Sequence, residues 1–215
     1  EAVRTPAGSG RFVVPTGQGG RDRRVVLVHG VRTSASMWRS QCELLSGHGY
    51  APIAIDLPGH GSRSGETFTL ASARAALDEA VDGDPRAAVV GLSLGGYVSM
   101  NWASRTATPP SALVLSSCTA LPGGLAHRAF LEFSRLVGRA PRLGELLSDR
   151  AARAVVGEQA AQDVARGGVS VAGQVQALQA MRDATPLADL VNITRSGIPV
   201  TFITGGFDHF RLDER

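Results

Sequence analysis

The residues best suited by type and spacing to do chemistry are Gly91-Leu92-Ser93-Leu94-Gly95. An apolar run over 87–91 leads into this segment, and a stretch of helical composition over 94–104 follows it. A Gly-x-Ser-x-Gly segment between a strand and a helix makes a sharp turn that lifts the serine hydroxyl off the sheet edge. Glycines at both flanks avoid collisions across that turn, and the helix N-terminus favours developing negative charge. The spacing predicts Ser93 as a nucleophile; a Gly-rich turn with an incidental serine is the structural alternative.

A second pair of residues, His29-Gly30, ends another apolar run upstream, over 25–29. Acyl transfer needs donors for the oxyanion of its tetrahedral intermediate, and one comes from the residue after the nucleophile. We therefore expect the oxyanion hole to use the backbone N–H groups of Leu94 and Val31. His29 itself is predicted to be structural, its imidazole holding the loop in place.

Strands and helices alternate along the part of the chain that carries these residues. Helices are predicted over 36–46, 69–81 and 94–104, and strands over 25–29, 52–56, 87–91, 112–117 and 199–204. This alternation predicts an α/β fold with a mainly parallel sheet, whose strands end at one common edge. The inward face of the first helix is predicted to be formed by Met37, Trp38, Leu44 and Leu45.

Residues 119–183 interrupt this alternation. No strand is evident there, and Ala, Leu, Arg, Glu and Gln dominate the composition. We therefore predict a helical insertion over 119–183 within a core domain made of 1–118 and 184–215.

Together, His29-Gly30, the segment Asp56-Leu57-Pro58-Gly59-His60-Gly61-Ser62, and Gly91-Leu92-Ser93-Leu94-Gly95-Gly96 resemble the esterase-like branch of the α/β-hydrolase family. The resemblance implies an α/β-hydrolase fold in which 119–183 is the helical cap. It implies Ser93 as the nucleophile and Asp208, in Gly205-Gly206-Phe207-Asp208, as the acid; a solvated turn residue is the alternative for Asp208. Asp56 and His60 lie in a loop that the family uses structurally.

A serine nucleophile at neutral pH needs a general base, and the family places its histidine after the acid. The chain has five histidines: His29, His48, His60, His127 and His209. The first three precede the nucleophile, His127 opens the predicted cap, and His209 directly follows Asp208. We expect the catalytic histidine to lie beyond Arg215, in a natural protein longer by about 40 to 60 residues.

The composition is that of a globular protein, with 43% hydrophobic and 19% charged residues and a net charge of +3. All 22 basic residues are scattered arginines, which does not indicate nucleic-acid binding. No apolar run is long enough for a membrane span. Cys42 and Cys118 are expected to be buried free thiols, which weakly indicates a cytoplasmic location.

The expected activity is cleavage of a small carboxylic ester, thioester or lactone through an acyl-enzyme, without metal or cofactor. A serine in place of a carboxylate argues against haloalkane dehalogenation. An acyltransferase and a non-catalytic ligand-binding protein on the same fold remain alternatives. Arg32, next to the predicted oxyanion loop, either recognises substrate or points to solvent or a surface carboxylate.

Overall fold

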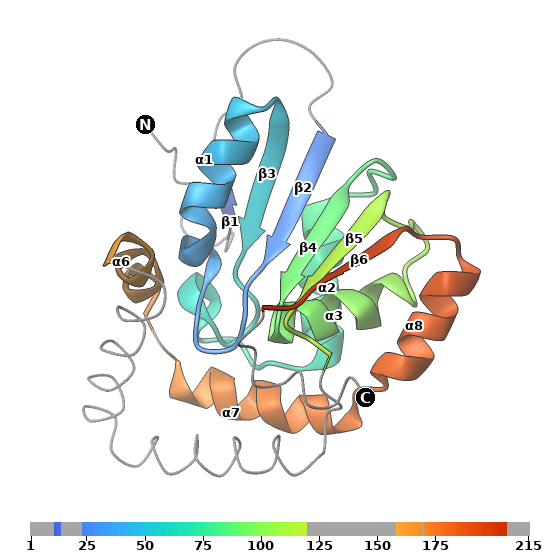
Figure 1. Cartoon of the computed structure of the whole chain (residues 1–215). Helices are drawn as coiled ribbons and strands as arrows, with labels where there is room; N and C mark the ends of the chain where they lie inside the picture. The colour runs from blue at the N-terminus through green and yellow to red at the C-terminus, as the bar shows by residue number, and fades with distance from the viewer. Residues whose placement is uncertain (1–10, 14–22, 120–157, 169, 206–215) are drawn as a thin grey trace.

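A six-stranded sheet forms the centre of the protein in a computed structural model that describes residues 11–13, 23–119, 158–168 and 170–205 (Figure 1). The strand order is β1-β3-β2-β4-β5-β6. β1 pairs antiparallel with β3, and every other pair is parallel. The strands are β1 (Arg11–Val13), β2 (Arg23–Val28), β3 (Tyr50–Ile55), β4 (Ala88–Leu92), β5 (Ala112–Ser116) and β6 (Val200–Ile203). The predicted α/β fold with a mainly parallel sheet is confirmed.

Helices cover both faces of this sheet (Figure 1). The α-helices are α1 (Arg39–Gly47), α2 (Leu70–Val81), α3 (Leu94–Ala103), α6 (Glu158–Arg166), α7 (Val171–Ala180) and α8 (Pro186–Arg195). Short 3-10 helices precede α1 (η1, Ala35–Trp38) and follow α7 (η3, Met181–Asp183). Another, η2 (Gly61–Arg63), follows β3.

The alternation of strand side chains divides the core into two layers. Val26, Val28 and Ile53 face the layer that contains α2, α3 and α8. Val25 and Leu27, their neighbours in sequence, face the layer formed with η1 and α1. A strand directs successive side chains to opposite faces, so a continuous apolar run fits a strand covered on both sides.

The sheet reverses its direction of growth between β2 and β4. The chain places β3 on one side of β2 and then crosses to place β4 on the other side. In open α/β sheets, ligands bind beyond the carboxyl ends of the strands at such a reversal. Here the segments that follow β2 and β4 are the His29 loop and the Ser93 turn, so the topology brings both to this point.

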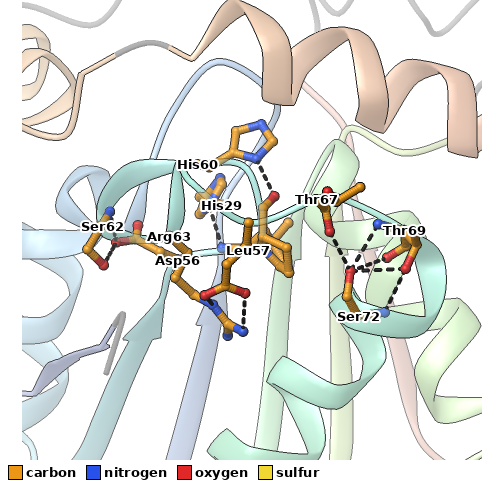
Figure 2. A network of polar contacts seen from close by, with 11 residues as sticks. His29, Asp56, Leu57, His60, Ser62, Arg63, Thr67, Thr69 and Ser72 are labelled. Atoms are coloured by element: carbon orange, nitrogen blue, oxygen red, sulfur yellow. Dashed lines mark hydrogen bonds and ion pairs between the residues drawn. The ribbon is translucent and has the colours of Figure 1, made fainter. Parts of the chain in front are cut away.

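The first two helices test the sequence predictions at the level of single residues. The helix predicted over 69–81 is α2, with Thr69 as its N-cap, and the hydroxyls of Thr69 and Ser72 form a reciprocal capping box, drawn in Figure 2. In α1, Cys42 is buried, whereas Leu44 is 62% exposed, so its prediction as an inward residue was wrong. The prediction assumes one α-helix over 36–46, whereas the structure has the 3-10 helix η1 before α1. A 3-10 helix has three residues per turn, so the side chains that follow it point in other directions than in a continuous α-helix.

Part of the predicted cap is described by the structure. Residues 120–157 lie outside the described ranges, and the remaining part forms α6, α7 and η3. In Figure 1, α7 runs across the carboxyl-end side of the strands. The extent of the cap, 119–183, stays a prediction. Within the described ranges, no helix is long and apolar enough to cross a membrane.

Two close contacts join these helices to the core. The buried carboxylate of Asp163 on α6 accepts from Arg39 Nε at 2.8 Å and from its Nη2 at 2.9 Å. On α7, Gly173 packs directly against Gly59, so a Cβ at position 173 would collide with the Gly59 carbonyl. An ion pair therefore holds α6 on α1, and a backbone-to-backbone contact holds α7 on the loop after β3.

Candidate active site

Ser93 occupies the turn between β4 and α3, at the carboxyl edge of the sheet. Its backbone has φ 50° and ψ −113°, and its N–H donates to the Ser116 carbonyl of β5 at 2.8 Å. A positive φ is rare for a residue with a side chain and costs roughly 1 to 3 kcal/mol. The Ser93 hydroxyl makes no capping hydrogen bond to α3. This is the strained strand-to-helix turn that the sequence motif predicts.

Glycines are required on both sides of Ser93 because backbone segments meet there. A Cβ on Gly91 would lie 2.5 Å from the Gly95 carbonyl oxygen, across the turn. A Cβ on Gly95 would lie 2.7 Å from the His29 carbonyl oxygen. Real Cβ atoms do not approach backbone atoms this closely, so side chains at these positions would force the turn open. The two glycines thus fix the turn and hold it against the end of β2.

The two predicted oxyanion donors belong to segments that meet at Ser93. Leu94 is the first residue of α3, and the first N–H groups of a helix have no acceptor within the helix. Val31 follows Gly30, whose Cβ position would lie 3.6 Å from the Ser93 Cβ. The loop after β2 is therefore in contact with the nucleophile turn. Their roles as oxyanion donors stay predictions.

His29 is buried beneath this loop with both ring nitrogens engaged. Leu57 N–H donates to its Nε2 at 3.0 Å, which places the proton on Nδ1, and Nδ1 donates to the Gly30 carbonyl at 2.7 Å. Burial is the main reason that the pKa of His29 falls to about 4, and the positive field of a protonated His60 adds to it. His29 is therefore neutral at physiological pH and supports the loop, as its place in the sequence predicts.

His60 and Asp56 support the neighbouring loop, as Figure 2 shows. His60 is buried, its Nδ1 donates to the Pro58 carbonyl at 3.0 Å, and its ring centroid lies 5.2 Å from that of His29. Burial lowers the pKa of His60. Asp56 accepts from Ala35 N–H at 2.7 Å and from the Ser62 hydroxyl at 2.8 Å. These contacts are those of structural residues.

Backbone strain concentrates at this edge of the sheet. Among the described residues, the non-glycine positions with positive φ are Arg32, Asp82, Ser93 and Ser117. Asp82 ends α2, whereas the other three follow β2, β4 and β5, where the His29 loop and the Ser93 turn lie. Strained backbone of this kind clusters at functional sites, so it points to the same edge of the sheet as the Gly-x-Ser-x-Gly motif.

The other predicted candidates divide by location. Asp208, His127 and His209 lie outside the described residues. His48 is exposed and follows α1 just before β3 begins, which puts it at the amino edge of the sheet, opposite Ser93. Arg32 is half-buried, and burial lowers its pKa. Within the described ranges, no group of three or more His, Cys, Asp or Glu side chains could hold a metal ion.

One further residue of this loop, Thr33, was not predicted from the sequence. Its hydroxyl donates to the Gly30 carbonyl at 2.8 Å, so this oxygen accepts from both Thr33 and His29. Threonine hydroxyls often bind the carbonyl three residues earlier, so the spacing from Gly30 to Thr33 carried a signal. The signal is common in loops and does not by itself indicate function.

A family comparison agrees with this fold. The model of the alpha/beta hydrolase family matches residues 25–210, which is most of the chain. The chain therefore belongs to the alpha/beta hydrolase family, and the resemblance inferred from its motifs is confirmed. A search among curated protein sequences found no significant match.

Solved structures show the same fold at low sequence identity. A hydrolase from Pseudomonas aeruginosa PA01 matches with a TM-score of 0.72 and 21% identity, over 94% of this chain and 80% of that chain. An enol-lactonase from Burkholderia xenovorans LB400 matches with a TM-score of 0.68 and 20% identity, over 91% of this chain and 77% of that chain. An esterase from Exiguobacterium antarcticum matches with a TM-score of 0.64 and 16% identity, over 95% of this chain and 91% of that chain. At these identities, the likeness establishes the fold and leaves the substrate open.

Proposed function

We propose that the protein is a serine hydrolase that cleaves a small carboxylic ester, thioester or lactone through an acyl-Ser93 intermediate. The observation that carries the proposal is the strained backbone of Ser93 at the N-terminus of α3, in contact with the loop after β2. A hydroxyl held at a helix N-terminus, beside backbone donors, suits attack on a carbonyl carbon. The esterase and the enol-lactonase with the same fold support this substrate class.

In the proposed reaction, Ser93 Oγ attacks the carbonyl carbon and gives its proton to a general base. The oxyanion that forms accepts from the N–H groups of Leu94 and Val31. The intermediate collapses as the alcohol, thiol or ring oxygen leaves with that proton. Water then attacks the acyl-enzyme by the same route and releases the acid and Ser93. The net change is addition of one water across the ester-like bond.

We assign the general base to a histidine outside the described residues. Both ring nitrogens of His29 are engaged, and His48 lies at the opposite edge of the sheet. His60 is buried with a lowered pKa, which makes it a weak base. Asp208 is proposed as the carboxylate that orients the catalytic imidazole, because family members place the acid in this turn.

The proposal is tested by turnover with a panel of p-nitrophenyl esters, a thioester and a lactone. The full-length protein is expected to release product from at least one of these classes, and Ser93→Ala to reduce the rate by about 10⁴-fold or more. Mass spectrometry of rapidly quenched reactions should find the acyl group on the peptide that contains Ser93. Turnover that survives in Ser93→Ala would contradict the proposal. Added alcohols would reveal an acyltransferase by forming a new ester.

A further inference from the structure

The carbonyl of Gly30 is held by two side chains at once. His29 Nδ1–H donates to it at 2.7 Å, and the Thr33 hydroxyl donates at 2.8 Å. A carbonyl oxygen has two lone pairs, so these donors use its full capacity. The peptide group between Gly30 and Val31 is thereby fixed by a clamp formed from the side chains of His29 and Thr33.

This peptide carries the predicted oxyanion donor of the loop. In a planar trans peptide the C=O and the N–H point in opposite directions. Donors that hold the Gly30 oxygen therefore turn the Val31 N–H away from the imidazole and the hydroxyl. The same peptide lies beside the nucleophile, since a Cβ on Gly30 would be 3.6 Å from that of Ser93.

Local backbone preference alone does not fix this peptide. Glycine adopts a wide range of backbone conformations, so Gly30 itself does little to orient the peptide that follows it. Two positions later, Arg32 has φ 65°, a conformation that needs support from its surroundings. The loop therefore depends on side-chain hydrogen bonds to keep one orientation.

The two halves of the clamp differ in their surroundings. The His29 ring is buried, and its tautomer is fixed by Leu57 N–H, so replacing it would disturb the core as well as the loop. Thr33 is only partly buried, and the threonine-to-valine change removes its hydroxyl while nearly keeping its shape. Thr33 is thus the half that can be removed cleanly.

We propose that Thr33 is a positioning residue for catalysis, whose hydroxyl orients the Gly30–Val31 peptide so that the Val31 N–H can donate to the oxyanion. This proposal rests on the proposed serine hydrolase function. It predicts that loss of the hydroxyl weakens transition-state stabilisation and leaves binding of the ground-state substrate nearly unchanged, because the oxyanion exists only along the reaction path.

The test compares Thr33→Val, Thr33→Ser and the matched control Thr194→Val in the full-length protein. Thr194, on the exposed side of α8, also donates its hydroxyl to a carbonyl, that of Leu190 at 2.9 Å. With a p-nitrophenyl ester, Thr33→Val should lower kcat by about 10-fold to 100-fold and change KM less than about twofold. Thr33→Ser should restore most of kcat, and Thr194→Val should match the wild type.

A nuclear magnetic resonance measurement separates this proposal from the proposed activity. The Gly30 carbonyl carbon and the Val31 amide resonances should move in Thr33→Val, return toward wild type in Thr33→Ser and stay in place in Thr194→Val. Unmoved resonances, unchanged kcat in Thr33→Val, or an equally impaired Thr33→Ser would overturn the role of Thr33. If the resonances shift as expected but the wild type shows no turnover, the result contradicts the proposed hydrolase function. The catalytic role of Thr33 then fails with it, although its contact with the Gly30 carbonyl stands.

Discussion

Gly95, the second residue of the helix after the nucleophile, lies against the carbonyl of His29 at the end of β2. A Cβ at position 95 would be 2.7 Å from that oxygen, so the contact exists only because glycine has no side chain. The contact joins the Ser93 turn directly to the loop that carries the second predicted oxyanion donor. Backbone packing thus sets how close the Ser93 turn lies to this loop, and the side chains of His29 and Thr33 hold the orientation of the Gly30–Val31 peptide.

Replacing Gly95 by alanine should therefore damage both stability and activity. The added methyl must push α3 away from β2, which we expect to lower the free energy of unfolding by about 2 to 3 kcal/mol. Urea denaturation measures this change. Gly47→Ala is the control, because a Cβ there meets nothing within 4 Å. A Gly95→Ala protein as stable and active as Gly47→Ala would contradict the packing argument.

The strained backbone of Ser93 predicts that glycine at this position is more stabilising than alanine. Ser93→Ala and Ser93→Gly both remove the hydroxyl, but only glycine adopts φ 50° and ψ −113° without steric cost. After the entropy cost of a glycine, Ser93→Gly should be more stable than Ser93→Ala by about 1 kcal/mol. Chemical denaturation of the two inactive variants measures the difference. Equal stabilities, or a more stable alanine variant, would show that the turn is not strained.

The ion pair between Arg39 and Asp163 should contribute strongly to the docking of α6. The Asp163 side chain is 2% exposed, so removing Arg39 leaves a buried carboxylate with a weaker partner, the exposed Arg166. Arg39→Gln should lower the free energy of unfolding by about 2 to 3 kcal/mol.

Glu43 supplies the matched control for this ion pair. It binds the same arginine at 2.7 Å, but its side chain is 57% exposed. Glu43→Gln should therefore cost less than about 1 kcal/mol. Similar losses in Arg39→Gln and Glu43→Gln would contradict the distinction between the two contacts.

The lowered pKa of His29 predicts that the stability of the protein depends on pH. Its pKa is lowered from 6.5 to about 4 in the folded protein, so between these values the unfolded chain binds the proton more readily. The free energy of unfolding should therefore fall as the pH drops from about 6.5 toward 4, by at most about 3 kcal/mol from this group. His60, whose pKa is also lowered, acts in the same direction.

Thermal or urea unfolding between pH 6.5 and 5 isolates this effect from the carboxylates. Glu66 and Asp84 have lowered pKa values, so their contributions are lost at lower pH. His29→Gln should reduce the slope of stability against pH across this window. An unchanged slope in the variant would show that His29 does not carry the effect.

The sequence predicted most of the sheet because its strands are continuous apolar runs with few competing interpretations. It also located the Ser93 turn, since a strained turn between a strand and a helix leaves a Gly-x-Ser-x-Gly signature. β1 and α8 were not predicted. β1 is only three residues long. α8 directly follows the predicted helical insertion, and its composition resembles that of the insertion.

Other features of the site leave no distinctive mark in the sequence. The clamp on the Gly30 carbonyl depends on which way a peptide faces, and a threonine in a loop is too common to reveal it. The contact between Gly59 and Gly173 joins residues far apart in the chain, and neither glycine indicates the other. The exposure of Leu44 depends on the 3-10 turn of η1, which helical periodicity does not anticipate.

The central claim, that Ser93 is an activated nucleophile, is tested most directly by covalent labelling with a fluorophosphonate. The full-length protein at neutral pH should acquire one phosphonyl adduct, which peptide mass spectrometry should locate on Ser93. Ser93→Ala should remain unlabelled under the same conditions. Absence of an adduct on Ser93, or equal labelling of wild type and Ser93→Ala, would contradict the account.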